Sequence, residues 1–312
     1  MNAELSKTRF ALETVESPAA LEEFPVYWRR FFVALAALAA CFCVPLYQML
    51  QLAFHSQLYS YLPLIPVISV YFAWQQRKQF PHHSRSALAI AGYFFAIGLA
   101  APAACWFKTS TVSEQDFLAV TLFSFVAFVT GAAALFLGRG VFRTLVFPLC
   151  FLIFMVPLPV ALQDGINRFL QVGSAAAAHA FFNLAGMPVL QDGLRFDLPG
   201  LSLHVAPECS GIHSSLVLLI TSVVAARVVL HSPWMRAALV LFTVPLALVR
   251  NGFRIWVIGE LCVHRGIEML NSPIHRHGGP LFFALSLIPL FALLIYFRRR
   301  EGKSSDSTAN VL

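Results

Sequence analysis

Long apolar runs dominate the chain, and short polar segments separate them. A membrane-spanning helix needs about 20 consecutive, mostly apolar residues. Eight runs approach that length, and they cover residues 31–50, 58–75, 87–106, 117–137, 142–161, 211–230, 235–261 and 279–297. The pattern therefore predicts an all-α polytopic membrane protein with about eight transmembrane helices.

Residues 162–210 interrupt this series of apolar runs. They form the longest segment that we expect to lie outside the membrane. Its first half is rich in alanine and is typical of an interfacial or re-entrant helix. Apolar and polar residues then alternate over 194–198 and again over 201–205, on either side of Pro199 and Gly200. This arrangement predicts a short extracytoplasmic β-hairpin directly before the sixth span.

Composition supports the membrane assignment and suggests an orientation. The chain is 58% hydrophobic and only 12% charged, whereas soluble domains average about 25% charged residues. Its net charge of +7 does not call for nucleic acid as a partner, because excess Lys and Arg marks the cytoplasmic segments of membrane proteins. With the N-terminus inside, 15 of the 22 basic residues fall in predicted cytoplasmic segments. We therefore expect a multi-pass protein of the plasma (inner) membrane with both termini in the cytoplasm.

The two ends of the chain are predicted to be tails. Residues 1–30 are polar and mixed in charge, and they lack the basic start, apolar core and cleavage site of a signal peptide. We interpret them as a disordered cytoplasmic tail. Residues 31–300 then form the membrane domain, and residues 301–312 form a second cytoplasmic tail.

The sequence APECSGIHSS leads into the sixth predicted span, and it places the thiol of Cys209 at the outer end of a helix. The six cysteines show no CxxC spacing, so neither a disulfide nor a zinc-finger framework is indicated. A helix N-terminus carries a partial positive charge and free N–H groups, which stabilise a thiolate. Gly211 leaves room for another backbone to approach the thiol. The alternative is a thiol that only packs at the helix start.

Two arginines lie in the seventh predicted span, within the sequence VRNGFRI. Arg250 and Arg254 are four residues apart and therefore share one helix face, with Asn251 beside them. A charge near the middle of a span costs at least about 2.5–3.5 kcal/mol. The pair therefore indicates a polar cavity, a partner or a function. Snorkelling to the interface, or ion pairing with Glu208 or Glu260, is the alternative.

The last predicted outer loop, NSPIHRHGGPLFF, adds the imidazoles of His275 and His277 on the same side of the membrane. An imidazole exchanges protons near neutral pH. A thiolate attacks acyl carbons, a guanidinium stabilises an oxyanion, and an imidazole moves the proton. These residue types together indicate acyl transfer or peptide cleavage, and the alternative is a pair of solvated loop histidines.

With these motifs the chain resembles the exosortase/archaeosortase family of membrane cysteine transpeptidases over residues 147–297. The resemblance rests on FLIFMVPLP, GMPVLQDG…FDLPGLSLHVA, PECSGIHSS, NGFRI and H…G…FF. It implies a Cys–Arg–His site at the outer membrane face, and we expect no cofactor. It also implies partners that carry a PEP-CTERM-like sorting signal, made of a short motif, a transmembrane helix and a basic cluster. Cleavage of that signal would serve protein sorting linked to exopolysaccharide or surface export.

The resemblance also implies roles for single residues. Cys209 matches the nucleophile, and Arg254 matches the arginine of an N-x-x-R pattern that starts at Asn251. The pattern H-x-x-x-G-x-x-F-F places the catalytic histidine at His275, although this chain has Pro280 where the family often has Trp. The residues expected in supporting or substrate-binding roles are Glu208, Ser210, Gly211, Arg250, Asn251 and His277.

Two other function classes stay open. Intramembrane arginines would also suit a non-enzymatic transporter, or a protein that binds a lipid phosphate or a polysaccharide carrier, and neither of these needs Cys209. A metal site from Cys209, His213, His275 and His277 would suit zinc or copper. The nearby arginines would repel a cation, so we expect no metal.

Overall fold

The computed structural model describes residues 18–81, 86–106, 112–206, 210–266, 268 and 279–309. The chain divides into two compact units, Met1–Pro159 and Val160–Leu312. Within the described residues the fold is mainly helical, and strands occur only in the second unit. The expected helical architecture is therefore confirmed, and the strands form a small three-stranded sheet where a hairpin was expected.

Six of the described helices are long and apolar enough to cross a membrane, and a bent pair of helices raises the number to seven. The six segments are Leu88–Cys105, Glu114–Phe136, Gly138–Met155, Ile212–Val229, Pro233–Arg265 and Gly279–Gly302. The expected count of eight is therefore not confirmed. Both differences lie near the N-terminus of the first unit.

The first expected span is not one continuous helix. Instead, α2 (Pro18–Cys41) and α3 (Cys43–His55) meet at a bend of 71° at Phe42. Pro45 explains the break, because it cannot donate a hydrogen bond to the carbonyl of Cys41 and its ring clashes with that group.

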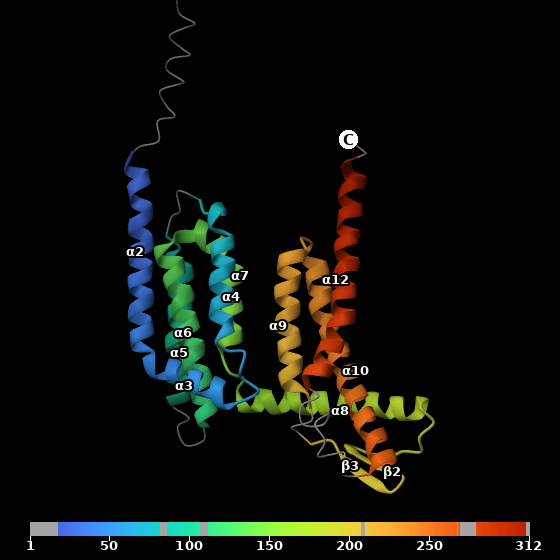
Figure 1. Ribbon diagram of the computed structural model, residues 1–312. Coiled ribbons are helices and arrows are strands. Elements are labelled where there is room, and N and C mark those ends of the chain that lie inside the picture. Colours follow the sequence, from blue (N-terminus) through green and yellow to red (C-terminus); the bar gives the residue numbers. More distant parts are fainter. Residues whose placement is uncertain are drawn as a thin grey trace, which may run out of the picture. The chain divides into compact units, whose positions relative to one another are not determined.

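The second expected span is reduced to the short helix α4 (Leu64–Gln75), which falls below the length of a span. Pro63 stands directly before this helix and Pro66 lies in its first turn. Proline is tolerated at a helix start because the first N–H groups have no partner within the helix. Figure 1 shows this unit, whose further elements are η1 (Arg77–Gln79), α5 (Leu88–Trp106), α6 (Glu114–Phe136), α7 (Gly138–Phe151) and η2 (Leu152–Met155).

Both expected tails are partly helical. α2 begins at Pro18, inside the segment 1–30, and α12 (Gly279–Ala309) continues past residue 300. The segment expected to be a disordered tail thus includes the first residues of α2. Residues 1–17 and 310–312 lie outside the described residues.

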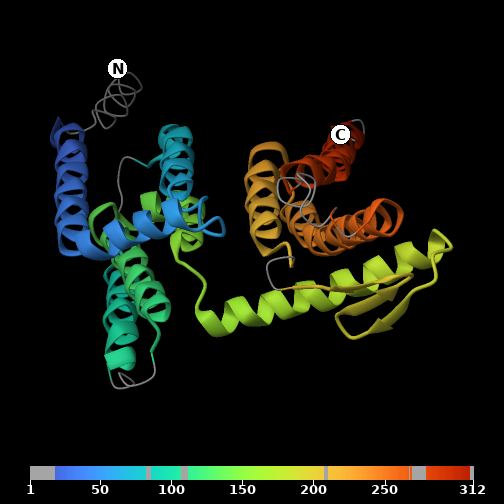
Figure 2. The same cartoon turned by 60° about the horizontal axis from the view of Figure 1, so that its bottom comes forward.

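The second unit joins a crossing helix, a small sheet and a set of packed helices. Figure 1 shows α8 crossing the ends of neighbouring helices, and Figure 2 shows the strands beside its second half. Its elements are α8 (Val160–Leu184), β1 (Leu190–Asp192), β2 (Arg195–Leu198), β3 (Leu201–His204), α9 (Ile212–Val229), α10 (Pro233–Arg265) and α12.

The predicted hairpin is confirmed. β2 and β3 pair antiparallel, with Leu198 opposite Leu201, and Gly200 takes a left-handed φ of +78° in the turn between them. Proline followed by a left-handed glycine is typical of a type II turn. The additional strand β1 pairs with β2, and its three residues are too few for an alternating pattern to reveal them.

The two faces of the hairpin differ in polarity. Phe196 and Leu198 are buried against Phe182 of α8, and burying one such side chain contributes about 1.5–3 kcal/mol. On the exposed face, the Ser202 hydroxyl and the Arg195 guanidinium hold the pKa of Asp197 below its ordinary value. The hairpin therefore has one apolar face on α8 and one charged face.

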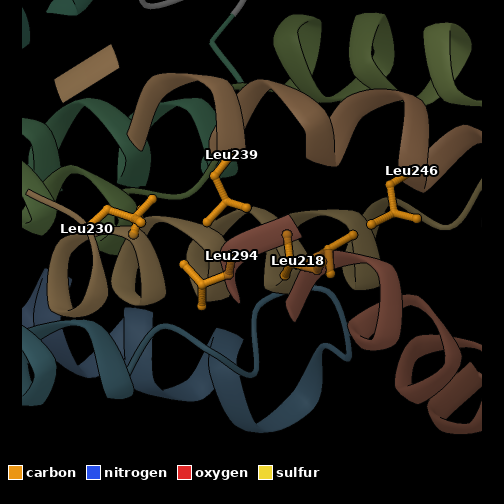
Figure 3. Close-up of a cluster of buried hydrophobic side chains, with 7 residues drawn as sticks. Leu218, Leu230, Leu239, Leu246 and Leu294 are labelled. Carbon is orange, nitrogen blue, oxygen red and sulfur yellow. The ribbon is translucent and has the colours of Figure 1, made fainter. Parts of the chain in front are cut away.

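Leucines from α9, α10 and α12 form the core of the packed helices in the second unit, as Figure 3 shows. The buried side chains are Leu218, Leu230, Leu239, Leu246, Leu290 and Leu294, together with Ala226. α10 has 33 residues and is about 50 Å long, which exceeds the hydrocarbon thickness of a membrane of about 30 Å. Its second half therefore extends beyond α9, and there it packs on α8 and the sheet.

α8 and α10 approach each other closely because small residues lie at their crossing. A Cβ atom added to Gly252 would lie 2.5 Å from the Ala177 Cβ and 2.9 Å from the Ala178 backbone nitrogen. Backbone atoms cannot rotate away as a flexible side chain can. The crossing therefore requires glycine at position 252.

Replacing Gly252 with alanine is expected to lower the free energy of unfolding by about 1–3 kcal/mol, the usual cost of overpacking. Denaturant titration in detergent micelles measures this change. Gly165→Ala is the matched control, since Gly165 lies in α8 with nothing within 4 Å of an added Cβ. Equal stability of the two variants would contradict the close crossing.

Candidate active site

The entry to α9 is a tight turn stabilised from two neighbouring helices. Gly211 is the N-cap residue, and its φ of +73° lies in the left-handed region that favours glycine. The Ser210 hydroxyl donates to Asn167 Oδ1 of α8 at 2.8 Å, and it accepts from the Ile212 backbone N–H at 3.3 Å. Ser210 is thus buried and fixed by its own side chain.

Two neighbouring residues of α10 bind successive carbonyls of this turn. Asn251 Nδ2 donates to the Ser210 carbonyl at 3.2 Å. Arg250 Nη2 donates to the Gly211 carbonyl at 3.4 Å and to the Ser215 hydroxyl at 3.2 Å. The arrangement joins the residues that directly follow Cys209 to the helix that carries the two arginines.

Gly211 is needed for a close approach as well as for its backbone conformation. A Cβ at this position would lie 3.0 Å from Asn251 Oδ1 and 3.3 Å from Arg250 Nη2. A close approach at Gly211 was expected from the sequence. Side chains of α10 make it, rather than another backbone.

Arg250 lies at the end of the α9–α10 pair and not at its middle. It contacts the N-cap residue of α9, while the other end of that helix leads into α10 through Ser232. The predicted span 235–261 placed Arg250 near its middle. The sequence does not show how far α10 extends beyond α9, and therefore the position of Arg250 along the helix pair was not predicted. Arg250 is nevertheless buried, and it meets polar groups at this position.

The start of α12 lies close to the same part of α10. Phe282 of α12 and Phe253 have ring centroids 6.2 Å apart, and Arg254 follows Phe253 directly. α12 begins at Gly279, shortly after the loop that carries the predicted histidines. The chain that follows that loop thus returns to the level of the arginines.

Four predicted site residues lie outside the described residues: Glu208, Cys209, His275 and His277. The structure gives the surroundings of Ser210, Gly211, Arg250 and Asn251, and it brings these four together. Glu260, an expected ion-pair partner of the arginines, lies 3.6 Å from the His264 imidazole.

The structure describes one of the four residues of the alternative metal site. That residue is His213, which stands in the first turn of α9. Within the described part of the chain there is no group of three or more metal-ligating side chains.

Three contributors to the site were missed by sequence reasoning: Asn167, Gln171 and Ser215. Ser215 follows Gly211 by four residues, and its hydroxyl donates to the Gly211 carbonyl at 2.8 Å. Asn167 and Gln171 are also four residues apart. Amide side chains at four-residue spacing on one face of α8, at Gln163, Asn167 and Gln171, were the available signal.

The fold and the site define a multi-pass membrane protein with a polar, arginine-containing turn at one end of its helices. A family model described as transmembrane exosortase matches residues 51–292, which is more than three quarters of the chain. The chain belongs to the transmembrane exosortase family, whose members are membrane cysteine peptidases or transpeptidases. No curated protein and no solved structure matches the chain. The match reaches well before residue 147, where the resemblance was expected to begin, and it covers part of each unit.

Proposed function

We propose that this protein cleaves a C-terminal, PEP-CTERM-like sorting signal at the extracytoplasmic face of the membrane, through a thioester on Cys209. Membership of the transmembrane exosortase family supports the class of reaction. The observation that carries the proposal is the pair of hydrogen bonds from Asn251 and Arg250 to the Ser210 and Gly211 carbonyls. They fix the backbone next to Cys209 beside the helix that carries Arg254.

The proposed chemistry has two steps. The Cys209 thiolate attacks the scissile carbonyl, and the Arg254 guanidinium stabilises the resulting oxyanion. The C–N bond then breaks as His275 protonates the leaving amine. An amine nucleophile, or water, attacks the thioester and releases the thiolate.

Arg250 is proposed to bind an acidic residue of the sorting motif. Its Nη2 already donates to Gly211 and Ser215, whereas its buried Nη1 has no hydrogen-bond partner among the described residues. A guanidinium with one nitrogen still available can bind a carboxylate in a charge-assisted hydrogen bond.

The proposed orientation places both termini in the cytoplasm and the turn before α9 on the outer side of the inner membrane. It rests on the distribution of basic residues along the chain. The basic residues assigned to the cytoplasm are Lys7, Arg9, Arg29, Arg30, Arg77, Lys78, Arg85, Arg139, Arg143, Arg227, Arg236, Arg298, Arg299, Arg300 and Lys303.

Co-expression with a membrane protein that carries the tripartite tail tests the proposal. Mass spectrometry is expected to find a shortened C-terminus that depends on this chain, and a tail that stays intact would contradict the activity. The same assay assigns the proton donor, because His275→Ala is expected to be inactive and His277→Ala active. The reverse result would move the role to His277.

A non-enzymatic transporter or carrier-binding protein is the second candidate. The buried Nη1 of Arg250 would suit a lipid phosphate as well as a carboxylate. Such a protein would leave the tail intact and would keep its function after alkylation of Cys209.

A further inference from the structure

Two amide side chains of α8 contact the chain on both sides of Cys209. Gln171 Nε2 donates to the Val205 carbonyl at 3.1 Å. Asn167 Oδ1 accepts from the Ser210 hydroxyl at 2.8 Å. Val205 precedes Cys209 in the sequence and Ser210 follows it, so both ends of this short segment are attached to one helix face.

We infer that Asn167 and Gln171 are positioning residues that act as a two-point clamp on the segment carrying Cys209. The inference rests on the proposed function only in naming Cys209 as the reacting group. The clamp itself consists of described residues, three of which (Gln171, Val205 and Ser210) are buried.

The clamp is attached to a rigid support. α8 packs on α10 at Gly252, where backbone and side-chain atoms of the two helices are in close contact. α10 in turn binds the Ser210 carbonyl through Asn251. Ser210 is therefore bound through its hydroxyl by α8 and through its carbonyl by α10.

Such a frame would control the reaction through geometry. A displacement of a reacting group by about 1 Å lowers a rate on the order of 10²-fold. Loss of either amide contact would release one end of the segment without removing any group that touches the substrate. The expected effect is therefore on turnover, with little change in substrate binding.

The two amides have opposite hydrogen-bonding roles, which makes the inference testable with isosteric changes. Asn167 accepts through Oδ1, so Asn167→Asp keeps the acceptor. Gln171 donates through Nε2, so Gln171→Glu removes the donor. A role limited to filling space would give the two isosteric variants similar effects.

The experiment measures two quantities for each purified full-length variant: kcat and KM for cleavage of the tripartite tail, and the alkylation rate of Cys209 by iodoacetamide across pH. Site-resolved mass spectrometry separates Cys209 from the other thiols. Asn167→Ala and Gln171→Glu are expected to lower kcat about 10- to 100-fold with KM nearly unchanged, and to alter the pH profile of alkylation. Asn167→Asp is expected to stay within about threefold of the unmodified protein, because it preserves the contact.

Asn183→Ala is the matched control, since Asn183 lies on the same helix, is exposed, and bonds only within α8 to His179 among the described residues. A double-mutant cycle of Asn167→Ala with Ser210→Ala adds a second readout. The two changes are expected to be strongly non-additive, because they remove the same hydrogen bond.

Three results would overturn the clamp: Asn167→Asp as damaging as Asn167→Ala, Gln171→Glu with the original kcat and alkylation profile, or full additivity in the cycle. Failure of the proposed function is a separate result. If Cys209→Ala still cleaves the tail, Cys209 is not the nucleophile, yet its alkylation rate in the amide variants still reports on the clamp.

Discussion

Replacing Cys209 with alanine is expected to abolish cleavage of the tripartite tail, with a loss on the order of 10³-fold or more. Among the described residues of the second unit the only thiol is Cys262, which lies further along α10 than the two arginines, and a serine hydroxyl lacks the thiolate character of cysteine. The measurement is the amount of shortened substrate formed per enzyme, determined by mass spectrometry after co-expression.

Cys150→Ala is the matched control, because Cys150 is an exposed free thiol of α7. This variant is expected to retain the original rate. Cleavage that persists in Cys209→Ala, or that disappears equally in Cys150→Ala, would contradict the assignment of the nucleophile.

Replacing Arg254 with lysine is expected to lower kcat about 10²- to 10³-fold, the usual effect of removing an oxyanion donor. Lysine keeps the charge but not the planar guanidinium, so it does not reproduce a directed pair of N–H groups. KM is expected to change little, because the lost interaction strengthens only as negative charge develops on the substrate oxygen. Steady-state kinetics on a purified substrate tail measures both constants.

Arg265→Lys provides the comparison, since Arg265 is exposed at the end of the same helix. Its rate is expected to match that of the unmodified protein. If Arg254→Lys keeps the original kcat, charge alone suffices at that position, and geometric stabilisation of the oxyanion is wrong.

The sequence predicted well those elements whose signal is local. Pro199 and Gly200 between two alternating runs predicted the β2–β3 hairpin. The apolar run after Gly211 predicted α9, because an uninterrupted apolar segment of this length is typical of a spanning helix. From the sequence we expected Ser210, Gly211, Arg250 and Asn251 in one site. The hydrogen bonds that join them are visible only in the structure.

Features that depend on packing were not predictable in this way. The bend between α2 and α3 follows from a single proline, Pro45, within an apolar run that otherwise looks continuous. The depth of Arg250 depends on how far α10 extends beyond α9. The roles of Asn167 and Gln171 depend on where α8 crosses, which no periodicity along the sequence reveals.

In the proposed mechanism, Cys209 forms a covalent acyl intermediate with the substrate at the entry to α9. Peptide mass spectrometry of the purified protein, after rapid quenching with acid in the presence of a substrate tail, tests it most directly. The expected result is an adduct of the N-terminal part of the substrate on Cys209 that neutral hydroxylamine removes, as expected of a thioester. Substrate cleavage without such an adduct, or an adduct on another residue, would contradict it.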